Sequence, residues 1–167
     1  MNMIIPYNRN AAIAYANRWA LSRNPEFYDY SQIGGDCTSF VSQCVYAGSG
    51  VMNYTPDFGW YYINANDKSP SWTGVQFFYD FMTNNQGMGP FAEERPLNSL
   101  LPGDVIQLAN ESGSFYHSLF LMAVRRTPRG RRYFVASHSQ DALNRNLSTY
   151  NFQNIRGIHI LGVRTDD

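Results

Sequence analysis

Apolar residues recur at helical spacing in three stretches of the first half of the chain. Asn8 is a suitable N-cap for the first helix, which is expected to end at Asn24-Pro25. A second stripe covers residues 37–47, before Gly48-Ser49-Gly50, and a third covers residues 75–84. The stripe of the first helix consists of Ala12, Tyr15, Ala16 and Trp19.

The second half of the chain changes to short β-like runs, at residues 105–108, 115–124, 133–137 and 157–163. Helices followed by strands predict an α+β fold, in which N-terminal helices pack on a C-terminal antiparallel sheet. Residues 52–74 show no steady period and are interpreted as a long irregular connection, a type of loop that often carries function.

Composition narrows the class of protein. The 167 residues are 44% hydrophobic and only 16% charged, which excludes a disordered chain and fits a single domain over residues 1–167. The 13 basic and 13 acidic side chains cancel, which argues against nucleic acid as a partner. No apolar run approaches the roughly 18 residues of a membrane span. The N-terminus lacks a basic segment and contains Pro6, so it does not resemble a secretory signal.

The balanced charge conceals an asymmetry. Residues 1–124 carry 5 basic and 10 acidic side chains, whereas residues 125–167 carry 8 and 3. Five of these arginines fall within residues 125–132, where Pro and Gly predict a solvated hairpin tip with Arg126 opposite Arg131. A binding patch for an anionic polymer is the other interpretation of the same cluster.

Cys37 has a chemically specific position. It stands at the expected helix start behind Gly35 and Asp36, and Asp36 is a suitable N-cap. The positive end of the helix favours a thiolate, which is the nucleophilic form of cysteine. The glycine allows a substrate backbone to approach, and N–H groups near Thr38 in the first turn could bind an oxyanion. Cys44, two turns further along, is expected to pack in the core, about 10 Å from Cys37.

A nucleophilic cysteine needs a base, and His117 and His138 are the candidates. A regular register of the hairpin pairs Leu119 with His138, which would make the two histidines diagonal neighbours on the face that covers the cysteine helix. Gln140 and Asp141 lie just beyond and are the other candidates for orienting the base.

The sequence gives less support to a catalytic role for the third histidine or to a metal site. His159 alternates with isoleucines in the last strand and is expected to be structural. No spacing typical of a zinc site is present, and we expect neither a metal nor another cofactor. The aromatic residues of the long connection, among them Trp60 and Trp72, are candidates for the walls of a substrate groove.

Six motifs stand out along the chain: Tyr7-Asn8-Arg9-Asn10-Ala11-Ala12, Gly34-Gly35-Asp36-Cys37-Thr38-Ser39-Phe40-Val41-Ser42-Gln43-Cys44, Ser71-Trp72-Thr73, Pro102-Gly103-Asp104-Val105, His117-Ser118 and Ser137-His138-Ser139-Gln140-Asp141. Together they resemble the bacterial family of putative amidase domains and, more distantly, the NlpC-type and CHAP cell-wall peptidases, which are papain-like cysteine hydrolases. The resemblance implies that Cys37 is the nucleophile, His117 the general base and then acid, and His138 the orienting third member. It also implies cleavage of an amide bond through an acyl-enzyme.

Three functions are compatible with these residues. The first is a thiol amidase or peptidase that acts on a peptide, such as the stem peptides of peptidoglycan. The second is an acyl transferase that uses the same thiol and base, and the third is a binding module that retains the fold without catalysis. The presence of both Cys37 and His117 favours the enzymes over the binding module.

Overall fold

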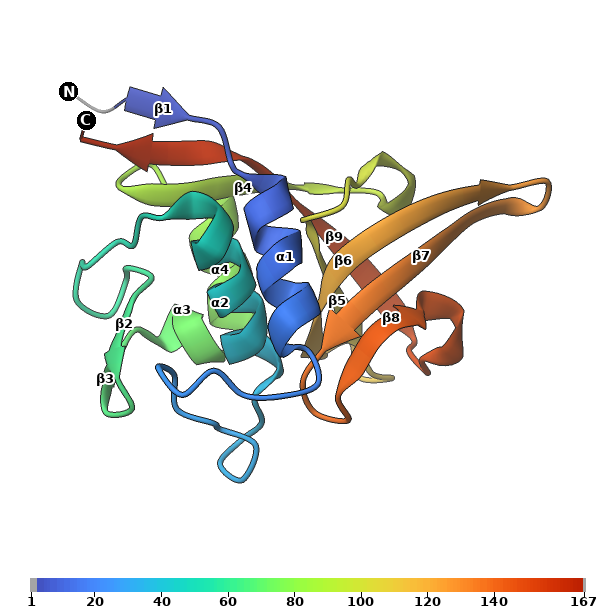
Figure 1. Cartoon of the computed structure of the whole chain (residues 1–167), viewed down its shortest axis with the longest axis horizontal. Coiled ribbons are helices and arrows are strands. Elements are labelled where there is room, and N and C mark those ends of the chain that lie inside the picture. Colours follow the sequence, from blue (N-terminus) through green and yellow to red (C-terminus); the bar gives the residue numbers. More distant parts are fainter. Residues whose placement is uncertain (1–2, 167) are drawn as a thin grey trace.

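A computed structural model describes residues 3–166 and shows an α+β fold in which helices pack on an antiparallel sheet (Figure 1). In the described residues the main sheet has the strand order β1-β9-β5-β6-β7-β8, with β4 paired to the other edge of β9. Its strands are β1 (Met3–Ile5), β4 (Gly89–Arg95), β5 (Val105–Ala109), β6 (Phe115–Thr127), β7 (Gly130–Ser137), β8 (Ala142–Asn146) and β9 (Asn154–Thr165).

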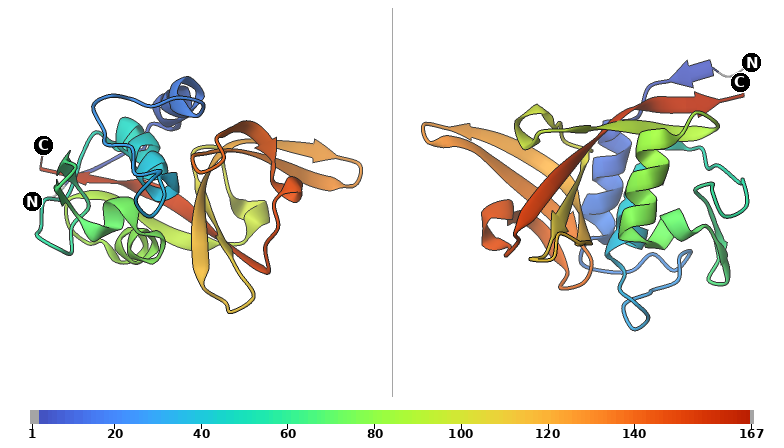
Figure 2. Two further views of the ribbon diagram at one scale, coloured as in Figure 1. Left: turned by 90° about the horizontal axis from the view of Figure 1, so that it is seen from below. Right: turned by 180° about the vertical axis from the view of Figure 1, so that it is seen from behind.

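The helices are α1 (Arg9–Trp19), α2 (Cys37–Ser49), α3 (Pro70–Thr73) and α4 (Val75–Asn84), and a small separate hairpin pairs β2 (Tyr62–Asn64) with β3 (Asp67–Lys68). Figure 2 shows α1 and α2 lying side by side, which agrees with the close packing of these two helices. Within residues 3–166, no helix combines the length and the apolar character that a membrane span requires.

The central strands are buried on both faces by two separate clusters of apolar side chains. Phe120 and Ala136 face the larger cluster, which they share with α1, α2 and α4. Leu119, Leu121 and Val135 face a smaller cluster on the opposite side. Successive side chains of β6 therefore point alternately toward the helices and away from them.

The expected helices are present, with changes at their ends. Asn8 caps α1 as predicted, because its Oδ1 accepts the N–H of Ala11 at 3.0 Å, but α1 ends at Trp19, before Asn24-Pro25. The third helix begins and ends where the periodicity places it, at Val75 and Asn84. The short elements β1, β2, β3, β8 and α3 were not predicted, and neither was the longer strand β4.

The predicted hairpin of β6 and β7 forms, but the predicted register is correct only near its tip. Arg126 pairs with Arg131 as expected, and the two strands project from the body as an arm (Figure 1). A bulge between Leu121 and Ala123 then shifts the pairing by one residue, so that Phe120 pairs with Ala136. Leu119 therefore cannot pair with His138, because a shift of one residue turns the side chains to the opposite face.

Candidate active site

Cys37 begins α2 beneath two glycines with left-handed backbone. Gly34 and Gly35 have φ angles of 83° and 101°, a region that side chains other than glycine rarely adopt. Cys37 is 8% exposed and lines a pocket of about 740 Å³. The turn before α2 thus presents the sulfur at the edge of a cavity large enough for a small peptide.

Asp36 does not cap α2 with its side chain, contrary to the prediction. Its carboxylate accepts the backbone N–H of Tyr30 at 2.8 Å and lies 2.6 Å from Nδ1 of His138. The carboxylate is therefore directed away from the first turn of α2. Its negative charge still acts on the start of α2, where it contributes to raising the pKa of the Cys37 thiol.

The first turn of α2 is joined to β6 by hydrogen bonds at Ser118. The hydroxyls of Thr38 and Ser118 lie 2.9 Å apart, and the backbone of Ser118 acts to lower the pKa of the Cys37 thiol, against the larger effect of burial. Ser118 also accepts a hydrogen bond from the side chain of Gln107 on β5. These contacts fix the sulfur against the strand residue that follows His117.

His117 lines the same pocket as Cys37. The pairing of β6 with β7 ends where Phe120 pairs with Ala136. His117 lies beyond this pair, where β7 does not cover the edge of β6. Its imidazole is 9% exposed, and within residues 3–166 neither ring nitrogen has a hydrogen-bond partner. The ring of Tyr150 lies 6.0 Å away. The imidazole is thus available to a molecule in the pocket.

Burial keeps both groups in their neutral forms. It raises the pKa of the Cys37 thiol, which corrects the expectation that the helix end produces a thiolate. Burial, together with the positive charge of Arg145, lowers the pKa of His117 to about 4. At neutral pH the pocket therefore holds a thiol and a neutral imidazole, which can accept the thiol proton.

His138 lies apart from His117, on the face that packs against the helices. Its Nδ1 contacts Asp36, and its Nε2 lies 2.9 Å from the carbonyl oxygen of Trp19. Its ring stacks on Phe40 with 4.1 Å between centroids and is 1% exposed. The predicted diagonal contact with His117 is therefore wrong, because the bulge in β6 places the two histidines on opposite faces.

Gln140 and Asp141 do line the pocket, in the turn between β7 and β8. Gln140 has a φ of 65°, and Asp141 forms a two-pronged ion pair with Arg23, at 2.8 and 3.1 Å. Asp141 thus has a partner of its own, and no hydrogen bond joins it to His117 within the described part of the chain.

Trp60 and Trp72 do not wall a groove. Both side chains are fully buried, and they pack against each other with centroids 4.9 Å apart. Nε1 of Trp60 donates to the hydroxyl of Ser42 in α2. The aromatic connection that precedes α4 therefore builds the core, and the expectation of a substrate surface there is wrong.

The other cysteine and histidine are buried in the structure. Cys44 is fully buried among the helices. Nδ1 of His159 lies 2.7 Å from Asp104, whose carboxylate also binds Arg9 at 2.8 Å. Among residues 3–166, no three histidine, cysteine or acidic side chains gather in a way that could hold a metal ion.

Two residues of the pocket had no signal in the sequence. Arg145 on β8 and Tyr150 beyond it both line the cavity with Cys37, although more than 100 residues separate them from it in the chain. Neither belongs to a motif, and only the return of β8 toward β6 brings them together. The structure alone identifies them.

The pocket joins a thiol at a helix start to an imidazole on a central strand, within an α+β fold. The profile of the putative amidase domain family matches residues 6–161, and the chain belongs to this family. The family name indicates hydrolysis of amide bonds.

One relative is the uncharacterized protein YhbB of Bacillus subtilis (strain 168), which is 31% identical over 120 residues. That alignment covers 70% of this chain but 37% of YhbB. No solved structure matches the chain.

Proposed function

We propose that the protein is a cysteine amidase or peptidase in which Cys37 is the nucleophile and His117 the general base. The observation that carries the proposal is the shared pocket, which exposes the Cys37 thiol and an imidazole without other hydrogen-bond partners. A helix that begins at the thiol and packs on the histidine strand also supports a papain-like arrangement, related to that of the NlpC-type and CHAP peptidases.

The reaction proceeds in two stages. His117 takes the thiol proton as the Cys37 sulfur attacks the amide carbon, and it gives this proton to the leaving amine when the carbon–nitrogen bond breaks. His117 then takes a proton from water as the water oxygen attacks the thioester. When the carbon–sulfur bond breaks, His117 returns this proton to the Cys37 sulfur, which releases a carboxylic acid and restores the free thiol. The neutral state of both groups at rest fits this order of proton transfers.

The first turn of α2 supplies stabilisation for the oxyanion. Because the Asp36 carboxylate is engaged by the N–H of Tyr30 and by His138, it forms no cap hydrogen bond with the N–H groups of this turn. The backbone N–H of Cys37 lies at this end, where negative charge on the carbonyl oxygen is favoured. Gly35 leaves the approach to this position open.

The test is hydrolysis of peptidoglycan stem peptides, followed by mass spectrometry of the products. Cys37→Ala should abolish release of the new amine and acid, whereas Cys44→Ala, which changes a thiol remote from the pocket, should retain it. Hydrolysis that persists in Cys37→Ala would contradict the proposal. Added amino-acid amides test transfer to an amine, since a transferase would form a new amide, whereas capture of the acyl group by water alone would exclude transfer.

A further inference from the structure

The pocket contains one positive charge without a counter-ion. Three charged side chains line it. Two of them, Arg23 and Asp141, form a two-pronged ion pair, and Arg23 also lies 3.2 Å from Asp29 and 3.8 Å from Asp36. The third is Arg145, which has no carboxylate within ion-pair distance among residues 3–166. A guanidinium in this position attracts an anionic group of whatever molecule enters.

The guanidinium of Arg145 is held in one orientation. Its Nε donates to the hydroxyl of Thr149 at 2.8 Å, and its Nη2 donates to the carbonyl oxygen of Thr149 at 2.9 Å. It also lies over the ring of Tyr150, 3.8 Å from the centroid. Nη1 makes no hydrogen bond within the part of the chain that the structure describes, so its N–H groups remain available to a ligand.

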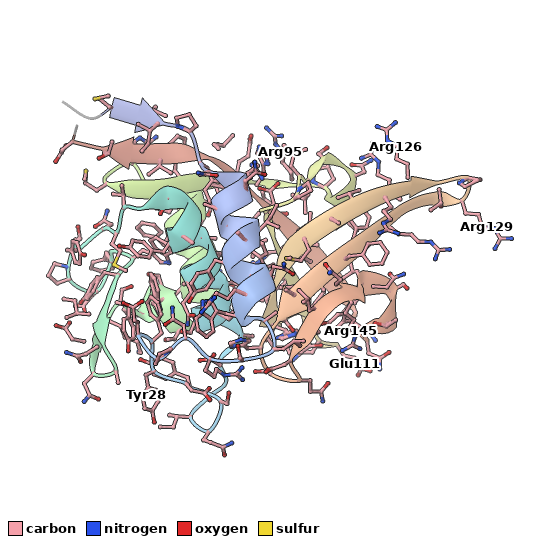
Figure 3. The ribbon with its side chains drawn as sticks, in the orientation of Figure 1. Tyr28, Arg95, Glu111, Arg126, Arg129 and Arg145 are labelled. Carbon is pink, nitrogen blue, oxygen red and sulfur yellow. The ribbon has the colours of Figure 1, made fainter. Side chains whose placement is uncertain are left out.

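Arg145 also differs from the arginines of the arm. Figure 3 shows Arg126 and Arg129 extending from the arm into solvent, whereas Arg145 lies back against the body of the molecule. Arg145 is partly buried and shares the pocket with Cys37 and His117. Its position suits recognition of the substrate, because it lies beside the proposed reacting groups and is already ordered.

We propose that the pocket selects substrates with a free carboxylate close to the scissile amide, and that Arg145 binds this carboxylate. The substrate class is therefore a peptide or acylated amino acid cleaved next to an unblocked carboxylate, such as a free C-terminus or an acidic side chain. This inference rests on the proposed function, since Cys37 and His117 define where the scissile bond lies.

The pKa of His117 reports whether an anion is bound to Arg145. Its positive charge lowers the pKa of the imidazole, so a carboxylate bound to Arg145 should raise that pKa again. The other titratable or charged groups around the pocket are Cys37, Tyr116, Tyr150, Arg23 and Asp141. Arg23 pairs with Asp141 and also with Asp29 and Asp36, so carboxylates outnumber guanidinium groups on this side of the pocket.

The test uses the full chain carrying Cys37→Ala, so that binding is measured without turnover. The ring protons of His117 are followed by NMR while N-acetylalanine or N-acetylalaninamide is added. The two probes differ only in their carboxylate and carboxamide. N-acetylalanine should bind and raise the pKa of His117, and N-acetylalaninamide should bind at least about tenfold more weakly.

Substitution of the arginine separates its role from general binding. Arg145→Gln should weaken binding of N-acetylalanine at least about tenfold and raise the pKa of His117 in the free protein. Arg132→Gln, which removes an exposed arginine of the arm, should change neither result. If Arg145→Gln does not fold, Arg145→Lys replaces it: the charge remains but the planar fork is lost, so binding should weaken several-fold.

Two results would overturn the inference: equal binding of the two probes, or undiminished binding of N-acetylalanine after substitution of Arg145. Neither depends on whether Cys37 is a nucleophile. Conversely, hydrolysis that survives Cys37→Ala would refute the proposed function and leave the binding result intact. The two failures are therefore distinguishable.

Discussion

Two histidines on opposite faces of the β6–β7 hairpin have opposite surroundings. On the face toward the helices, His138 is fixed by Asp36, by the Trp19 carbonyl and by stacking on Phe40. On the other face, His117 has no hydrogen-bond partner within residues 3–166 and borders a cavity with Cys37. The comparison suggests that His138 contributes to stability, while His117 is free to take part in proton transfer.

Substitution of the two histidines should separate these roles most strongly. His117→Gln should lower kcat/KM by about a thousandfold, since it removes the proposed base, and should leave the protein folded. His138→Gln should reduce kcat/KM far less in the fraction that remains folded. Steady-state kinetics combined with circular dichroism provides the measurement. A larger kinetic loss in folded His138→Gln would reverse the comparison.

The stability of the two variants should show the opposite order. His138→Ala removes the imidazole from the buried Asp36 carboxylate, which keeps the N–H of Tyr30, and opens a cavity beside Phe40, at a cost of roughly 3 kcal/mol of unfolding free energy. His117→Ala breaks no hydrogen bond to the described residues and should cost less. Urea unfolding measures both values, and equal losses would contradict the distinction.

The pH dependence of stability should arise from the face that carries His117. Its pKa lies near 4 in the folded protein, below the value of 6.5 expected for the unfolded chain, so the unfolded state takes up the proton first as pH falls. Its contribution is fully present above pH 6.5 and is lost as pH falls toward 4, by about 3 kcal/mol in total. His117→Gln should remove this part of the pH dependence in urea unfolding experiments at a series of pH values. An unchanged profile would contradict the assignment.

The smallest effect on catalysis is expected from the aromatic core on the helix side. Trp60→Phe removes the hydrogen bond to Ser42 and part of a buried ring, which should cost about 1 to 3 kcal/mol of stability. Because Trp60 does not line the pocket, kcat and KM should stay unchanged. A clear rise in KM, measured in the folded variant, would restore the idea of an aromatic substrate groove.

Local signals predicted much of the fold. The apolar stripe of α4 and the Asn8 cap of α1 depend on residues a few positions apart, and both appear as expected. The α+β class followed from the change of period along the chain. β1 has only three residues, and both β1 and β4 depend on their pairing with β9, so no local pattern indicated these strands.

The candidate site was predictable only in part. The glycines before Cys37 and the polar break at His117 are local features, and the structure brings both residues to one pocket. The face on which His138 lies depends on a bulge in β6, and no residue pattern predicted this bulge. Asp36 and Arg145 are defined by contacts with distant segments, so their roles become visible only in three dimensions.

The central claim is that Cys37 attacks an acyl group with His117 as its base, and p-nitrophenyl acetate tests it directly. After brief exposure at pH 7, peptide mapping by mass spectrometry should find a single acetyl group on Cys37 in the unsubstituted protein and in Cys44→Ala. Acetylation should be absent in Cys37→Ala and at least about a hundredfold slower in His117→Gln. Acetylation at another residue, or an equal rate in His117→Gln, would contradict the account.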